Sequence, residues 1–155
     1  MSTPNTDIRV RRPQAHEALL IELREEALFP TFRDILLFAA ALGAQAGRRV
    51  PFTEAGEPIR YDTLREPQFA DALVSMIAAT ELPDDPEIMD GSRLGERVRI
   101  FEEYANGGLA RIQEQINAGN QPAATVVLAL VAEALEHDGA TTPIPVEELL
   151  SGMNW

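Results

Sequence analysis

The stretch of sequence that decides the fold is IFEEYANGGL, residues 100–109. Apolar residues recur at helical spacing before it and after it, whereas the stretch itself holds an Asn and two adjacent glycines. A glycine pair inside a helix costs about 2 kcal/mol relative to alanine, so Gly107 and Gly108 need a structural or functional reason. Two reasons fit the sequence. Either the glycines permit a close helix crossing, or they form a sharp helix end or kink that presents Glu103 and Tyr104 to a partner protein.

Helical signals cover most of the remaining chain. Capping residues, prolines and apolar repeats predict about five helices. These lie in residues 13–29, 31–46, 67–82, 92–119 and 122–138. On the third helix, the predicted buried face consists of Phe69, Leu73, Met76 and Ile77.

The second predicted helix, Thr31 to Ala46, has the features of a core element. Thr31 and Asp34 have the spacing of a capping box, and residues 35–42 are apolar nearly all round, which indicates burial on every side. Small residues also repeat every four positions, a spacing that lets another helix approach closely. This row consists of Ala39, Gly43 and Gly47.

Residues 50–61 break the helical pattern. Two short apolar runs, VPF and IRY, flank a polar turn there, which fits either a short β-hairpin or an irregular loop. Residues 1–12 are polar and are expected to be flexible. The sequence therefore predicts an all-α fold: a compact single-domain bundle in residues 13–155, with a hairpin near residues 50–61 as one option.

Composition and charge exclude several classes of function. The chain has no Cys and no Lys, which rules out disulfides, thiolate chemistry, a lysine Schiff base and a P-loop. Residues 1–60 hold eight Arg and eight acidic residues, so residues 61–155 carry the whole net charge of −12. A field of that sign repels phosphate backbones. We therefore expect little or no direct nucleic-acid binding. With no apolar run long enough for a signal peptide or a membrane span, we also expect no membrane contact and a cytoplasmic location.

Patterns for catalysis and metal binding are weak. Glu133 and His137 lie one helical turn apart, but two ligands are too few for a metal site. His137 is better explained as a partner for the negative end of its helix dipole. We predict no catalytic, cofactor-binding or metal-binding residues. An enzyme site near Tyr104, Glu102 or His137 remains an alternative.

Two groups of residues are candidates for binding. The predicted partner-binding residues are Glu103, Tyr104, Asn106, Gly107 and Gly108. The candidates for phosphate contact are Arg9, Arg11, Arg12, Arg48 and Arg49, which are otherwise interpreted as solvated charges at segment ends.

Two segments carry a family resemblance. FRDILLFAAALG, residues 32–43, and FEEYANGGL, residues 101–109, resemble the small accessory proteins encoded beside bacterial DNA phosphorothioation (dnd) systems. The resemblance implies a role in sulfur-modified DNA or its restriction, and thus in antiviral defence, but it supplies no catalytic residue.

We therefore expect a non-enzymatic adaptor that contacts other proteins of a DNA modification or restriction system. A direct DNA-binding subunit that uses the N-terminal arginines is the main alternative. The sequence does not give the oligomeric state or the identity of the partner.

Overall fold

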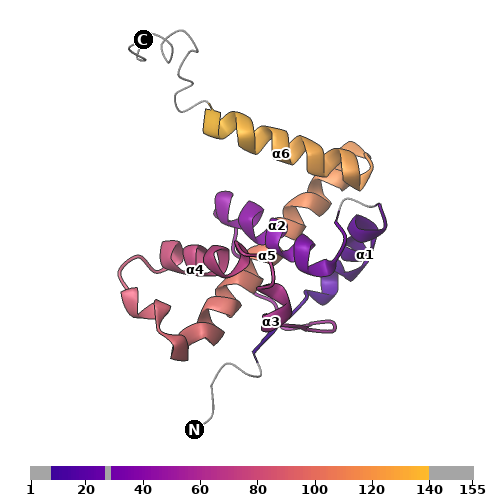
Figure 1. Cartoon of the computed structure of the whole chain (residues 1–155). Coiled ribbons are helices and arrows are strands. Elements are labelled where there is room, and N and C mark those ends of the chain that lie inside the picture. Colours follow the sequence, from indigo (N-terminus) through magenta and orange to yellow (C-terminus); the bar gives the residue numbers. More distant parts are fainter. Residues whose placement is uncertain (1–7, 27–28, 140–155) are drawn as a thin grey trace, which may run out of the picture.

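The computed structural model describes residues 8–26 and 29–139. Within them the chain forms an all-α fold with one short antiparallel sheet, as predicted (Figure 1). The α-helices are α1 (Glu17–Glu25), α2 (Phe32–Gln45), α3 (Tyr61–Leu64), α4 (Ala70–Glu81), α5 (Leu94–Gly119) and α6 (Ala123–Gly139). The short 3-10 helices are η1 (Gln14–His16), η2 (Pro86–Met89) and η3 (Gly91–Arg93), and the strands are β1 (Arg9–Val10) and β2 (Ile59–Arg60).

Helix α5 is continuous over 26 residues and passes through the Asn-Gly-Gly segment without a break. The predicted helix end or kink at this segment is therefore wrong. Among the described residues only Gly47 and Asn120 have a positive φ, so Gly107 and Gly108 keep ordinary helical backbone angles. Helix α5 ends instead at Asn120, whose φ of 48° gives the left-handed C-cap that asparagine tolerates.

Helix α2 lies at the centre of the core, as predicted, and makes its most extensive contacts with α5. Its start is the predicted cap: the Thr31 hydroxyl oxygen accepts a hydrogen bond from the Asp34 amide (3.3 Å) and donates one to the Asp34 carboxylate (2.7 Å). The helix is apolar on nearly every side because most of it is covered, although Ala41 within the apolar run is exposed. The buried residues are Ile35, Leu36, Leu37, Ala39, Ala40, Leu42 and Gly43.

The C-terminus of α2 is a Schellman motif centred on Gly47, which has a φ of 64°. The Arg48 amide donates to the Gly43 carbonyl (2.8 Å), and the Gly47 amide donates to the Ala44 carbonyl (3.1 Å). Nothing lies within 4 Å of where a Gly47 side chain would be. Gly47 therefore ends α2. It is not part of the close helix contact that the spacing of Ala39, Gly43 and Gly47 predicted.

The buried face of α4 differs from the predicted one. Phe69 and Met76 are 59% and 63% exposed. The side of α4 that faces the core carries small residues, Ala70 and Ala78, in place of Phe69 and Met76. Small side chains let α4 lie closer to α5 than Phe69 and Met76 would. The buried residues are Ala70, Val74, Ile77 and Ala78.

The two-stranded sheet pairs β1 with β2 in antiparallel register. Its second strand lies in the region where a hairpin was predicted, but its partner is the N-terminal strand, because residues 50–58 run irregularly. Val10 is fully buried, so the predicted flexible segment 1–12 is wrong from residue 8 onward. Residues 1–7 lie outside the described residues.

Helix α6 lies across one side of the molecule, where it contacts α5 and α1 (Figure 1). Pro122 precedes it, as predicted. In the described part of the chain no single helix is long and apolar enough to span a membrane; α5 and α6 reach that composition only together, and they are bent by 115°. The predicted domain also includes residues 140–155, which lie outside the described residues.

Candidate functional site

Glu102, the first carboxylate of the quoted stretch, is bound by Arg11 near the N-terminus. Its carboxylate accepts hydrogen bonds from Arg11 through the backbone amide (2.6 Å), Nε (3.0 Å) and Nη2 (2.9 Å). The Arg11 guanidinium also lies 4.5 Å from the centroid of the Phe52 ring. Burial raises the pKa of Glu102, and the bonds from Arg11 oppose that rise. The pair therefore ties the segment before η1 to the middle of α5.

Glu103 and Tyr104 join a second network. Arg49 Nε donates to Glu103 (2.7 Å) and Arg49 Nη1 donates to Glu81 (2.6 Å), while Arg99 lies 3.5 Å from the other Glu103 oxygen. The Tyr104 hydroxyl donates to Glu81 (2.7 Å). The bonds from Arg49 and Tyr104 lower the pKa of Glu81, whereas burial raises that of Tyr104. The adjacent carboxylates of Glu102 and Glu103 thus bind different arginines, Arg11 and Arg49.

Asn106 and Gly107 hold the chain that returns from α2. The Asn106 side-chain amide donates to the Val50 carbonyl, and the Val50 amide donates to the Glu103 carbonyl, both at 3.0 Å. A Cβ atom on Gly107 would overlap the carbonyl oxygen of Arg48. Glycine is required there because the backbone of another segment occupies the place of a side chain.

Gly108 and Gly43 form the contact between α5 and α2. A Cβ atom on Gly108 would overlap the Ala39 carbonyl oxygen, and one on Gly43 would overlap the Tyr104 carbonyl oxygen. The two helices thus meet backbone to backbone. The interpretation of the glycines as a close helix crossing is confirmed, including the predicted part that Ala39 and Gly43 play in it.

All five predicted partner-binding residues are buried among these internal contacts; Glu103 is 3% exposed, Asn106 6% and Tyr104 9%. Of the five, Tyr104 also lines a surface hollow between α2 and α4, whereas contact of the other four with another protein would require α5 to be uncovered. Their role in binding a partner stays a prediction, while their role in packing explains each residue type.

Four of the five arginines predicted as phosphate contacts are held by carboxylates. Beside Arg11 and Arg49, Arg12 lies 3.0 Å from Glu17 and Arg48 pairs with Glu114. Arg12 is also buried, so the alternative interpretation of these arginines as solvated ends is wrong for it. Arg9 differs: it is exposed and forms no ion pair with any described residue.

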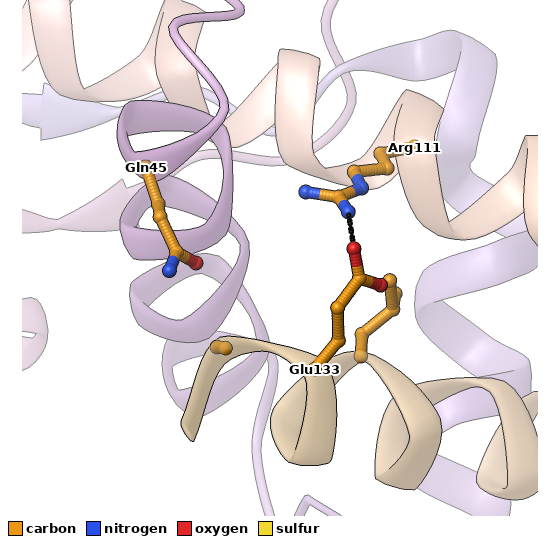
Figure 2. A pocket seen from close by; sticks show the side chains of 5 residues that line it. Gln45, Arg111 and Glu133 are labelled. Carbon is orange, nitrogen blue, oxygen red and sulfur yellow. Dashed lines mark hydrogen bonds and ion pairs between the residues drawn. The ribbon is translucent and has the colours of Figure 1, made fainter. Parts of the chain in front are cut away.

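Figure 2 shows a hollow of about 200 Å³ where α2, α5 and α6 meet. Arg111 of α5 donates to Glu133 of α6 (3.2 Å) on one side, and Gln45 of α2 lies opposite. Glu133 therefore links α6 to α5 through Arg111. Across the described residues no group of three His, Cys, Asp or Glu side chains is placed to hold a metal ion. His137 lies in the last turn of α6, as its sequence position predicts.

This hollow is part of a larger apolar surface, which we call the α2 groove. It has one arm between α2 and α6, of about 420 Å³, and another between α2 and α4, of about 320 Å³. Ala41 and Gln45 line both arms, so the arms adjoin each other along the exposed side of α2. The other lining residues are Phe38, Leu42, Ala44, Leu73, Met76, Ile77, Thr80, Tyr104, Leu130, Val131, Ala134 and Leu135.

Sequence reasoning missed this groove. Met76 was assigned to the core, and Ala41 was counted only as part of the apolar run of α2. A sequence signal did exist: α6 is apolar at Leu128, Val131 and Leu135, beyond the stripe that packs on α5 and α1. When the neighbouring helices cover only part of the apolar surface of a helix, the remaining apolar surface indicates a further contact.

The fold and the groove define a small helical protein with an exposed apolar surface. The family model for DNA sulphur modification system-associated protein 4 matches residues 9–147, and the chain belongs to this family. The resemblance to accessory proteins of dnd systems is thereby confirmed. No curated protein and no solved structure matches the chain.

Proposed function

We propose that this protein is a non-enzymatic accessory protein of a DNA sulphur modification system, and that it binds another protein of that system in the α2 groove. One observation carries the proposal: within the described residues, apolar side chains from α2, α4 and α6 remain exposed around two adjoining hollows. Met76 is 63% exposed and Leu135 is 68% exposed. Single exposed apolar residues are ordinary, whereas a contiguous apolar surface marks an interaction site.

The shape and charge of the groove indicate the chemistry of its partner. An elongated apolar groove between helices accepts the apolar face of an amphipathic helix. The segments that supply α4 and α6 belong to the half of the chain that carries the whole net charge of −12. Glu136, next to the groove residue Leu135, is exposed. The expected ligand is therefore an amphipathic helix whose apolar face is flanked by Lys or Arg.

Two groups of the alternative enzyme site, which also includes His137, are engaged by other residues of the domain. Glu102 is bound by Arg11, and the Tyr104 hydroxyl donates to Glu81. An acid–base catalyst must have a proton-transfer atom within reach of substrate. These groups instead face charged partners inside the domain, which supports a binding function. A role in restriction and defence, and a cytoplasmic location beside the DNA, are part of the same proposal.

Affinity purification of the tagged full-length chain, co-expressed with the other proteins of its modification system, tests the proposal. Ala41→Glu places a charge in the middle of the groove. Ala79→Glu, on the exposed side of α4 and outside the groove, is the matched control, because both alanines are exposed helical positions. We expect one protein of the system to co-purify with the wild type and with Ala79→Glu, and to be lost with Ala41→Glu.

Thermal melts of both variants check that the fold is intact. A second arm, Glu136→Arg, tests the charge of the ligand: it should weaken binding, and the loss should shrink as salt is raised. Retention of the partner by Ala41→Glu would contradict the proposal. A wild-type chain that instead forms a dimer through the groove would also contradict it, because the occupant would then be a second copy.

A further inference from the structure

Two exposed arginines face each other across the small sheet. The register places Arg9 of β1 directly opposite Arg60 of β2, so their side chains lie on the same face. The Tyr61 amide donates to the Ile8 carbonyl (3.0 Å), so Ile8 and Tyr61 form a hydrogen-bonded pair. Pair types alternate along an antiparallel ladder, and the next pair, Arg9 and Arg60, is therefore a non-hydrogen-bonded one. In this type of pair the opposite side chains approach most closely. Like charges at this position destabilise a sheet.

No described carboxylate offsets this repulsion. Neither Arg9 nor Arg60 forms an ion pair within the described residues, whereas nine other arginines do. The contrast is strong because acidic residues outnumber basic ones by twelve in this chain. A pair of uncompensated cations at close spacing is expected where an anion binds between or beside them.

A third arginine, Arg99, lies on the same hollow as Arg9. Arg9 and Arg99 line one hollow of about 460 Å³, together with Arg11 and Phe52. Arg99 is 71% exposed, and its contact with Glu103 is 3.5 Å long, because Arg49 already binds that carboxylate at 2.7 Å. The floor of the hollow is neutral, since Arg11 binds Glu102 through three hydrogen bonds.

We propose that Arg9, Arg60 and Arg99 form a site for backbone phosphates of DNA. The planar guanidinium fork matches a phosphate bidentately, and the site is open rather than enclosed, as an extended strand requires. The site has three arginines, and the rest of the chain is acidic and repels phosphate. The site therefore contacts about three phosphates. Such a contact orients the protein on DNA that other proteins of the system hold. The site is separate from the α2 groove: α3, which directly follows β2, lies on the side of the molecule remote from α6 (Figure 1).

Fluorescence anisotropy with a short duplex oligonucleotide tests this site in the full-length chain. With about three phosphates, the logarithm of the binding constant should fall with the logarithm of salt concentration with a slope of about −2.7. Binding measurable at 25 mM salt should therefore weaken about 100-fold at 150 mM salt.

The decisive variant is Arg9→Glu. It should abolish DNA binding at low salt and, because attraction replaces repulsion across the strands, raise the melting temperature by about 1–3 °C. Arg65→Glu is the control: Arg65 is exposed, pairs with Asp62, does not line the hollow, and gives the same change in net charge. It should leave DNA affinity within about twofold.

Three results would overturn the site: no binding of wild type at 25 mM salt, equal losses for Arg9→Glu and Arg65→Glu, or binding of inorganic pyrophosphate without binding of DNA. Ala41→Glu should leave DNA binding unchanged. Failure of this inference and failure of the proposed function are thus distinguishable.

Discussion

Gly108 of α5 and Ala39 of α2 meet backbone to backbone, so that a Cβ atom on Gly108 would overlap the Ala39 carbonyl oxygen. Backbone atoms cannot move aside as the end of a flexible side chain can. The crossing of the two central helices therefore depends on the absence of a side chain at this position. The Asn-Gly-Gly segment is conformationally unfavourable for a helix, and the crossing is the reason for its presence.

Gly108→Ala should destabilise the protein by about 1–3 kcal/mol, because the added methyl group forces α2 and α5 apart. Gly95→Ala in the same helix is the control. Nothing lies within 4 Å of a Cβ atom at position 95, so alanine should stabilise the helix there by up to about 1 kcal/mol. Urea unfolding of both variants checks the prediction. A stabilising effect of Gly108→Ala would mean that the helices do not cross as described.

Glu102→Gln should lower the free energy of unfolding by about 1–3 kcal/mol. The change removes the negative charge that binds Arg11 and leaves the hydrogen-bonding groups of Arg11 partly unpaired. Asp62→Asn is the control, because Asp62 forms an exposed ion pair with Arg65. It should lower the free energy of unfolding by less than about 1 kcal/mol. Equal free energies of unfolding for the two variants would show that the link between Arg11 and α5 does not contribute to stability.

Burial raises the pKa of both tyrosines, and hydrogen bonds to Asp71 and Glu81 raise the pKa of Tyr61 and Tyr104 further. An unfolded tyrosine ionises with a pKa of about 10. The native protein therefore keeps protons that the unfolded chain loses, and stability falls as pH rises above about 10. Absorbance at 295 nm should show less tyrosine ionisation at pH 10 without urea than in concentrated urea, where about half of the tyrosine is ionised. Early ionisation of either native tyrosine would contradict its placement.

Acid should weaken the network around Glu81. Hydrogen bonds from Arg49 and Tyr104 lower its pKa below the ordinary value of 4.5. This carboxylate therefore contributes stability above pH 4.5, and the contribution is lost as pH falls through the lower folded value. The free energy of unfolding should differ between wild type and Glu81→Gln at pH 7, and the difference should shrink toward pH 3. A difference independent of pH would assign the effect of Glu81 to packing alone.

Local sequence patterns were sufficient for the helices and for the main crossing. The Thr31 cap, the burial of α2, the part of Ala39 and Gly43 in the crossing, and the helix stop at Asn120 each depend on residues close together in the chain. The kink at Gly107 and Gly108 was predicted wrongly because propensity alone cannot show that a neighbouring backbone occupies the space. Tertiary packing then outweighs the poor helix propensity of glycine.

The binding surfaces depend on residues that are distant in sequence. Arg11 and Glu102 are 91 positions apart, so their pairing has no local signal. The Arg9–Arg60 pair exists only because the N-terminal strand, rather than residues 50–52, pairs with β2. The α2 groove depends on the rotation of α4, in which the small residues Ala70 and Ala78 turn inward and Met76 turns outward.

Site-specific photo-crosslinking from position 41 in living cells tests the central claim most directly. A photoreactive amino acid there lies in the middle of the α2 groove, and the same amino acid at position 79 is the control outside it. The account predicts a crosslink from position 41, absent from position 79, to an amphipathic helix with basic flanks in another protein of the DNA sulphur modification system. A crosslink from position 41 only to a second copy or to the chain's own residues would contradict the account, as would equal crosslinking from both positions.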